Sequence, residues 1–341
     1  MTRLLNGVGL GTFPFAGPFS ELGDDATSIL GAYLDAGGTY IDTAPTYDYG
    51  EVESVLGREL AKRPRESFFV NTSCGYILDG EGKAYVVSGR PEDVIADCDA
   101  SLSRLGLEYI DSYISHIPDP NVPFAETVGA MEELRQAGKV RMLGVSNVTL
   151  EQLEEYNASG AISLVQNRFS YLNRSIAADF ADYCVSHDVG IVAYQVIERG
   201  MLTAKGRGVF VLRDGDLRQV KSEFGDEIRE AISAWVSTSV TPIAERHGVP
   251  LAALAVWWAL QQPFVALAQF GATSVAQIQE TMRVCDASLP AETLRELDDA
   301  YAVLSSQLAS DEKGSVRDFL GLSTYNFYGG SATGKGVAPQ S

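Results

Sequence analysis

Short apolar runs alternate with amphipathic runs along most of the 341-residue chain. Most of the apolar runs are five to eight residues long, as is typical of strands covered on both faces. Each is followed, directly or after a loop, by a segment whose apolar residues recur at helical spacing. The pattern predicts eight strand-then-helix units, with strands at residues 8–13, 39–44, 68–74, 109–116, 140–147, 163–169, 190–196 and 264–271.

The helical segments carry boundary signals of their own. Several end at glycine, as at Gly37-Gly38, Gly138 and Gly160, which favours a left-handed cap before the next strand. Thr149 and Ser274 stand directly before helical runs and are good N-cap residues. The predicted helices cover residues 26–38, 51–63, 91–106, 124–138, 150–160, 176–188, 251–262 and 274–285.

Alternating strands and helices imply a parallel sheet, and eight units can close into a (β/α)₈ TIM barrel. The alternative is an open doubly wound sheet, but GVGLG at residues 7–11 is a weak version of its nucleotide-binding fingerprint. We expect a single barrel domain over residues 1–341. It has an insertion at about 205–247, which contains a helix, and a C-terminal extension from about 291 with one more helix and a tail.

The composition of the chain argues against some classes of binding partner. The chain carries 45 acidic and 26 basic residues, a formal net charge of −19, which argues against binding nucleic acid or an anionic membrane surface. Its four cysteines show no metal-binding spacing, and neither a signal peptide nor a long apolar span is apparent. We therefore expect reduced thiols, a cytoplasmic location, no metal and a small-molecule substrate.

In a TIM barrel, reactive groups lie where strands end and the following loops begin. The second predicted strand ends in Asp42, with Tyr47 five residues later, and the fourth ends in His116. Further polar residues stand at the ends of the fifth, sixth and seventh strands. The sequence therefore predicts an active site at the barrel mouth around Asp42, Tyr47 and His116.

Five segments, in order along the chain, resemble motifs of one known family, the aldo-keto reductases. They are IDTAPTYDYGEVESVLG (41–57), IDSYISHIPDP (110–120), VRMLGVSN (140–147), GIVAYQVIERGMLTAK (190–205) and QFGATSVAQIQET (269–281). Each segment alone is moderately specific, and the five in this order are much more so. The resemblance runs from about residue 9 to about residue 287, roughly four-fifths of the chain.

The resemblance implies an NAD(P)-dependent oxidoreductase acting on a polar carbonyl or alcohol, including sugar-like metabolites. Tyr47 corresponds to the proton donor, His116 to the group that binds the substrate oxygen, and Asp42 to the supporting carboxylate. The fourth catalytic position, a lysine in the family, is Ser73 here. A phenol titrates near about 10, and a hydroxyl cannot ease its ionisation as an ammonium does. Asp48, where the family has glycine, adds a carboxylate beside Tyr47.

The resemblance also implies cofactor-binding positions. Ser146, Asn147 and Gln166 correspond to groups that hold the nicotinamide carboxamide, and Tyr194 to the aromatic ring that stacks on it. The loop and helix with Gly271, Thr273 and Glu280 correspond to the adenine-side phosphate site, where backbone N–H groups can cradle an anion. Gly271 and Gln277 stand where the family often has basic residues for the 2′-phosphate, which favours NAD over NADP.

Three functions remain open at this point. The first is the oxidoreductase just described. The second is a redox-neutral dehydratase, lyase or epimerase on the same barrel, suggested by Ser73 and Asp48. The third is a non-catalytic nicotinamide-binding interaction subunit, hinted at by aromatic residues in the tail. The loops expected to set the substrate, near 13–24, 76–90, 117–123 and 205–230, contain no interpretable motif.

Overall fold

Eight parallel strands close into a barrel in the order β1-β10-β9-β8-β7-β6-β3-β2. The computed structural model describes residues 7–16, 22, 24–78, 85–174, 176, 178–203, 226–283 and 288–309. The prediction of a closed (β/α)₈ barrel is confirmed, and the open sheet is excluded because β1 pairs with both β2 and β10. The barrel strands are β1 (Gly7–Gly11), β2 (Tyr40–Asp42), β3 (Phe69–Cys74), β6 (Ile110–Ser115), β7 (Val140–Ser146), β8 (Ile162–Arg168), β9 (Gly190–Tyr194) and β10 (Val265–Phe270).

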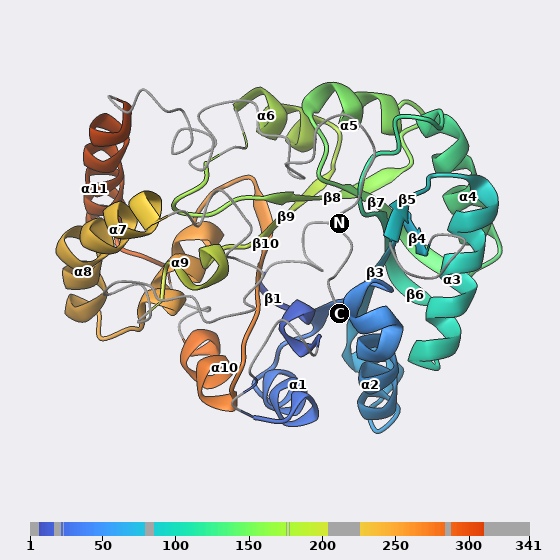
Figure 1. The fold of residues 1–341 in the computed structure, drawn as a ribbon, viewed down its shortest axis with the longest axis horizontal. Helices are drawn as coiled ribbons and strands as arrows, with labels where there is room; N and C mark the ends of the chain where they lie inside the picture. Colours follow the sequence, from blue (N-terminus) through green and yellow to red (C-terminus); the bar gives the residue numbers. More distant parts are fainter. Residues whose placement is uncertain are drawn as a thin grey trace.

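Helices lie around the outside of the strands (Figure 1). Thr149 and Ser274 cap α5 and α10 through their side chains, and Gly37, Gly138 and Gly160 have positive φ, so these boundary predictions are confirmed. The helices that follow the eight strands are α1 (Ala26–Asp35), α2 (Glu51–Leu60), α3 (Pro91–Leu105), α4 (Phe124–Gln136), α5 (Leu150–Tyr156), α6 (Ala178–Ser186), α9 (Leu251–Leu260) and α10 (Val275–Met282).

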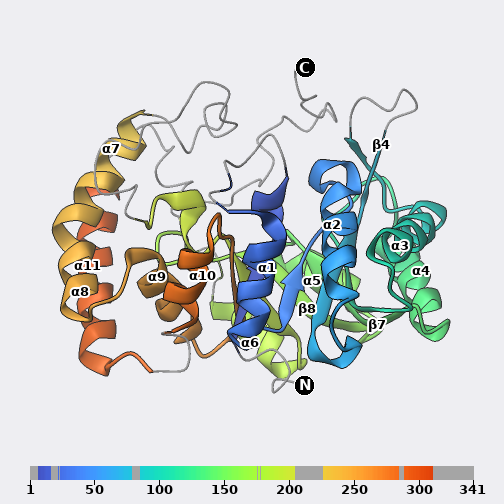
Figure 2. The same cartoon turned by 90° about the horizontal axis from the view of Figure 1, so that it is seen from below.

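Part of the expected insertion is helical. After residues 204–225, which lie outside the described part, α7 (Asp226–Trp235) continues through a π-helical turn (Val236–Val240) into α8 (Thr241–Arg246). The expected C-terminal helix is α11 (Ala291–Ala309), and the tail beyond it also lies outside the described part. Helices α7, α8 and α11 gather at one side of the barrel, beyond α9 (Figures 1 and 2).

The loop after β3 contains a hairpin that the sequence did not reveal. Strands β4 (Tyr76–Leu78) and β5 (Tyr85–Val87) pair antiparallel, and β4 stands at the upper end of the barrel in Figure 2. Two strands of three residues each are too short to show an alternating pattern. A stacked pair of rings, Tyr49 and Tyr85, joins the hairpin to the turn after β2. The hairpin therefore borders the same barrel end as the predicted active site.

The barrel interior is built in layers. Its lower layer is apolar and includes Tyr40, Leu164 and Leu267, with Phe69 and Met142 packed against it. Side chains two residues apart on a strand point to the same face. The next layer is therefore filled from positions two residues further along four of these strands, and all four are polar: Asp42, Asn71, Gln166 and Gln269.

Glycines in β1 make room for this polar layer. A Cβ atom on Gly11 would lie 2.8 Å from Nε2 of Gln269, and one on Gly9 would lie 2.7 Å from Cδ2 of Leu267. Any side chain at these two positions would displace the residue that β10 contributes to the interior. β1 thus pairs through its backbone with both β2 and β10, and the space inside the barrel beside it is filled by side chains of β10.

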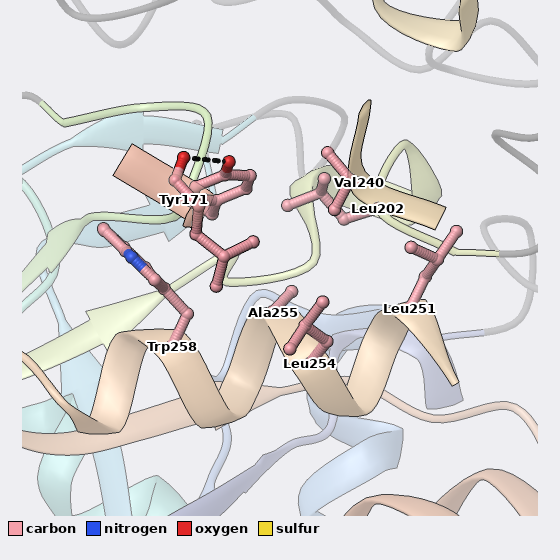
Figure 3. A pocket seen from close by; sticks show the side chains of 8 residues that line it. Tyr171, Leu202, Val240, Leu251, Leu254, Ala255 and Trp258 are labelled. Carbon is pink, nitrogen blue, oxygen red and sulfur yellow. Dashed lines mark hydrogen bonds between the residues drawn. The ribbon is translucent and has the colours of Figure 1, made fainter. Parts of the chain in front are cut away.

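An apolar pocket lies against α9 and is unsuited to catalysis. The hydroxyl of Tyr171, its one ionisable side chain, donates a 2.5 Å hydrogen bond to the backbone oxygen of Leu297 (Figure 3). The pocket is a packing gap where α11 docks on the barrel. Its lining consists of Tyr171, Leu202, Val240, Leu251, Leu254, Ala255, Trp258 and Leu297.

We expect Gly11→Ala to lower the free energy of unfolding by about 1–3 kcal/mol, because the added methyl group must push Gln269 aside in a packed interior. Urea denaturation measures this change. Gly129→Ala is the matched control, because Gly129 lies in α4 and a Cβ added to it would meet no neighbouring atom within 4 Å. It should leave stability unchanged or raise it by up to about 1 kcal/mol. Equal stabilities for Gly11→Ala and the parent protein would contradict the layered interior.

Candidate active site

Asp42 is a buried carboxylate held by two side-chain amides. It ends β2 and is 1% exposed. Nδ2 of Asn71 donates to Oδ1 at 2.7 Å, and Nε2 of Gln269 donates to Oδ2 at 2.6 Å. Among the described residues, no ion pair involves Asp42. Amides therefore occupy both of its oxygens.

Burial raises the pKa of Asp42 to about 6, although the hydrogen bonds from Asn71, Gln269 and Gln166 act in the opposite direction. Amide dipoles stabilise the charge less than a cation would, so the loss of water around the carboxylate dominates. Asp42 is therefore largely ionised at pH 7 but takes up a proton in mildly acidic solution.

Ser73 and His116 form the second polar contact of the site. Ser73 points into the barrel from β3 and is 2% exposed, and its Oγ lies 2.9 Å from Nδ1 of His116. His116 follows β6 directly, and its backbone N–H donates to the backbone oxygen of Cys74. Ser73 thus contacts the histidine.

Burial lowers the pKa of His116 to about 4. The ring of Tyr76 lies edge-on to the imidazole, with centroids 5.5 Å apart, and shields one side of it. The imidazole is therefore neutral across the physiological range. A neutral imidazole donates a hydrogen bond from only one of its two nitrogens.

Tyr47 begins the 3₁₀ turn Tyr47–Gly50, five residues after Asp42. Its half-buried ring lies edge-on to Phe13 from the loop after β1, with centroids 5.3 Å apart. The next residues, Asp48 and Tyr49, have φ angles of 49° and 53°. Asp48 thus occupies a left-handed conformation that glycine adopts most readily.

Backbone strain is concentrated at this end of the barrel. In the described part of the chain, seven residues other than glycine have positive φ, and six of them follow β2, β7 or β9. Such conformations cost about 1–3 kcal/mol each and cluster at functional sites. The six residues are Asp48, Tyr49, Asn147, Gln195, Glu198 and Arg199.

Asn147 joins three of the predicted cofactor residues to His116. Its Nδ2 donates to the backbone oxygen of His116 at 2.8 Å and to Oγ of Ser146 at 3.1 Å. Its Oδ1 accepts from the Tyr194 hydroxyl at 2.6 Å. Ser146 in turn donates to the backbone oxygen of Gln166, whose side-chain oxygen accepts from Asn71 at 3.4 Å. Hydrogen bonds thus connect Ser146, Gln166 and Tyr194, which come from three strands, to the rest of the site. The connection to His116 runs through Asn147, and the connection to Asp42 runs through Asn71.

The adenine-side residues form a separate group on the β10–α10 loop. Ser274 caps α10 by accepting from the N–H of Gln277, and Oε1 of Gln277 accepts from the N–H of Thr273 at 2.8 Å. A Cβ atom on Gly271 would lie 2.6 Å from Cγ of Pro14, so this position excludes side chains. Glu280 is exposed on α10. None of these four predicted residues takes part in the hydrogen bonds described around Asp42 and His116.

Three buried polar atoms at the mouth have no hydrogen-bond partner in the described structure: Oγ1 of Thr43, Oε1 of Gln195 and Oε1 of Gln269. They belong to residues at the ends of β2, β9 and β10. Buried polar atoms without partners are costly, so a polar ligand that hydrogen-bonds to these three would stabilise this end of the barrel. With Asn147, Ser146 and Tyr194 nearby on the network, the residues present fit a nicotinamide dinucleotide.

Sequence reasoning missed Asn71, Gln269 and Gln195 as members of the site. Asn71 and Gln269 could have been found by counting two residues along β3 and β10 from apolar interior positions. Their pairing with Asp42 could not, because Gln269 lies 227 residues away in the chain. The strained conformation of Gln195 has no sequence signal.

Comparisons with known proteins agree with this geometry. A sequence model of the Aldo/keto reductase family matches residues 7–302. The chain belongs to this family. An NADH-specific methylglyoxal reductase from Escherichia coli (strain K12) is 30% identical over 327 residues, covering 89% of this chain and 95% of that protein. An aldo-keto reductase from Bacillus subtilis (strain 168) is 31% identical over 296 residues, covering 85% and 88%.

Solved structures of aldo-keto reductases share the fold. A glycerol dehydrogenase from Gluconobacter oxydans superposes with a TM-score of 0.78 at 31% identity, covering 87% of this chain and 91% of that one. An aldo-keto reductase from Klebsiella pneumoniae in complex with NADPH gives 0.65 at 25% identity, covering 86% and 90%. This aldo-keto reductase is an NAD(P)-dependent oxidoreductase, and the comparisons do not favour a redox-neutral enzyme or a non-catalytic subunit.

Within the described ranges, no helix combines the length and apolar character needed to cross a bilayer. In the same ranges, no three or more His, Cys, Asp or Glu side chains are grouped so that they could bind a metal ion. Cys74, Cys98 and Cys184 are buried free thiols, and Cys285 lies outside the described residues.

We expect Asp42→Asn to change how stability depends on pH. The raised pKa means that ionisation of Asp42 costs folding free energy, and this cost grows as pH rises from about 4 to about 6. The free energy of unfolding of Asp42→Asn minus that of the parent protein should rise by about 2–3 kcal/mol from pH 4 to pH 7.5, at 1.36 kcal/mol per pKa unit. Gln269 can turn its unpartnered oxygen toward the new amide. A difference independent of pH would contradict this account.

We expect the imidazole signals of His116 to stay constant from pH 5.5 to pH 8 and to move only toward pH 4, because burial disfavours the charged ring. Nuclear magnetic resonance of the labelled protein measures this directly. The chain has only three histidines, so His187 and His247 serve as internal markers and His116→Asn assigns the signal. Titration of His116 near its ordinary value would show that the ring is solvated.

Proposed function

We propose that this aldo-keto reductase interconverts a small polar carbonyl compound and its alcohol with NAD(H), using Tyr47 as proton donor and neutral His116 as the donor to the substrate oxygen. In this proposal Ser73 stands where the family has a lysine, and its role there is to position His116. Asp42 supports the site through Asn71. The hydrogen bond between Ser73 Oγ and His116 Nδ1 carries the proposal.

This hydrogen bond selects one form of the imidazole. Ser73 is buried, and the contact with His116 is the one hydrogen bond that the structure gives its hydroxyl. If Nδ1 donated to Ser73, the hydroxyl hydrogen would remain buried without an acceptor, at about 1–3 kcal/mol. Ser73 therefore donates to Nδ1, and Nε2 carries the hydrogen. His116 can then donate from Nε2 to a carbonyl oxygen and stabilise the negative charge that develops there.

Tyr47 completes the chemistry at the oxygen. In the reducing direction its hydroxyl transfers a proton to the carbonyl oxygen, and solvent then restores that proton. In the oxidising direction the phenolate must accept the alcohol proton. With no ammonium from position 73 to favour the phenolate, the oxidising direction depends more strongly on alkaline pH.

Several residues would hold the cofactor. Asn147, Ser146 and Gln166 would present amide and hydroxyl groups to the carboxamide, and Tyr194 would offer its ring to the nicotinamide. The orphaned oxygen of Gln195 is a further acceptor at the same strand end. When bound, the reduced nicotinamide supplies the hydride that the chain's own residues cannot.

Two features support NAD(H) over NADP(H). Gly271 has no space for a basic side chain, because Pro14 lies where its Cβ would be. Gln277 is uncharged, and its side-chain oxygen accepts from Thr273. A 2′-phosphate would therefore find no cation at these two positions, and the Escherichia coli relative is named as NADH-specific.

The names of two relatives, a methylglyoxal reductase and a glycerol dehydrogenase, support a substrate with few carbons and several oxygens. Sugar-like compounds share this chemistry. The polar network at the mouth offers hydrogen bonds to such oxygens, whereas the apolar pocket against α9 does not.

We expect Ser73→Ala to lower kcat about tenfold or more with little change in KM, because His116 loses the donor that selects its tautomer and orientation. The ¹⁵N spectrum of His116 should change from one protonated form, at Nε2, to a mixture of both. Ser73→Thr keeps the hydroxyl and should restore kcat and the spectrum. Cofactor oxidation with methylglyoxal and related small carbonyl compounds provides the assay.

Three results would count against the proposal. Absence of NAD(H) binding in calorimetry would remove the cofactor from it. Unchanged activity and an unchanged ¹⁵N spectrum in Ser73→Ala would remove Ser73. Product formation without any change in nicotinamide absorbance would support the redox-neutral alternative instead.

A further inference from the structure

A buried ion pair joins the end of β8 to the turn that follows β9. Nη2 of Arg168 donates to Oε2 of Glu198 at 2.5 Å, and Nε of Arg168 donates to Oε1 at 3.4 Å. Oγ of Ser170 donates to the same Oε1 at 2.5 Å. The side chains of Arg168 and Glu198 are 5% and 1% exposed, so both charges are almost completely removed from water. The reaction proposed above uses neither of them.

The carboxylate of this pair belongs to a turn with an unfavourable backbone conformation. Gln195, Glu198 and Arg199 have φ angles of 57°, 46° and 49°. Residues with a side chain rarely adopt left-handed backbone, and they keep it only where their surroundings hold them there. The hydrogen bonds from Arg168 and Ser170 fix the side chain of Glu198 to β8 and to the loop after it. The ion pair therefore holds the strained turn from outside.

Both ends of the ion pair lie directly beside residues of the proposed cofactor site. Arg168 is the register partner of Tyr194 in the pairing of β8 with β9. The backbone N–H of Glu198 donates to the backbone oxygen of Gln195 at 2.7 Å. Oε1 of Gln195 is one of the buried oxygens that have no partner in the described structure. The ion pair thus fixes the backbone around Tyr194 and Gln195.

We propose that Arg168 and Glu198 are positioning residues that hold the turn after β9 in its cofactor-binding form before the cofactor arrives, an inference that rests on the proposed function. A buried ion pair adds little net stability, because the loss of water from both charges offsets their attraction. Its geometry is demanding, since the two N–H groups of a planar guanidinium fix where the carboxylate lies. The cofactor then does not have to order the turn when it binds, which strengthens its affinity.

The test removes both charges together, because removing one would leave the other buried and unpaired and would destabilise the whole protein. The double variant Arg168→Met with Glu198→Gln keeps two side chains of similar length, and the new amide oxygen can still accept from Ser170. The matched control is Arg65→Met with Asp111→Asn. It removes another largely buried ion pair, also with an N–O distance of 2.5 Å, near the start of β6 and so at the opposite end of the barrel.

Hydrogen exchange measured by mass spectrometry on the full-length protein reports whether the turn is held. The N–H groups of residues 198, 200 and 201 donate to backbone oxygens within the turn. In the double variant at positions 168 and 198, we expect them to exchange about tenfold faster or more without cofactor, and saturating NADH should restore their protection. In the control variant, their exchange should match that of the parent protein.

Calorimetry with NADH measures the consequence for binding. We expect the dissociation constant of the double variant to rise about tenfold or more, because NADH must now order the turn. The KM for NADH should rise with it, whereas kcat at saturating NADH should fall by much less, since the bound cofactor restores the turn. The control variant should bind NADH as the parent protein does.

The outcomes separate this inference from the proposed function. If the double variant binds NADH as tightly as the parent protein, or if the turn is unprotected in the parent protein, the positioning role is overturned. An equal loss of affinity in the control variant would assign the effect to general destabilisation and overturn it too. If the parent protein binds no NADH although its turn is protected, the proposed function itself fails.

Discussion

A buried carboxylate held by two amides is the constraint on which the site depends. Asp42 lies in the barrel interior, where an unpaired charge would be prohibitively costly. Asn71 and Gln269 make it tolerable by donating one hydrogen bond to each oxygen. Amides satisfy the carboxylate without neutralising it, so the pKa of Asp42 stays raised and the site keeps a negative charge at neutral pH. The interior is built around that charge, and no cation is required at position 73.

The arrangement depends on strand register and on small residues. A polar layer forms because Asp42, Asn71, Gln166 and Gln269 all lie two residues beyond apolar interior positions. A slip of one residue in any strand would turn its polar group out of the barrel. Gly11 then leaves the space through which Gln269 reaches Asp42. Stability and site geometry are thus set by the same packing.

In the function proposed above, Ser73 stands in place of a lysine, which redirects a contact as well as removing a charge. Ser73 is too short to serve Tyr47 and Asp42 as a lysine would, and it hydrogen-bonds to His116. The histidine, neutral and sterically confined by Tyr76, is further held through its backbone by Asn147. In the proposed function, electrostatic assistance to the phenol is exchanged for preorganisation of the imidazole, so that an oxidoreductase could work at this site without the ammonium.

The amino-acid sequence by itself determined the barrel, the family and the strand ends that carry Asp42, Tyr47, His116, Asn147 and Tyr194. These features depend on local periodicity and on short motifs, both of which can be recognised in the sequence alone. The hairpin at 76–87 and the amide partners of Asp42 were decided only by the tertiary structure. The contact of Gln269 with Asp42 depends on barrel closure, because β10 returns to pair with β1. No local pattern records a contact made across more than two hundred residues.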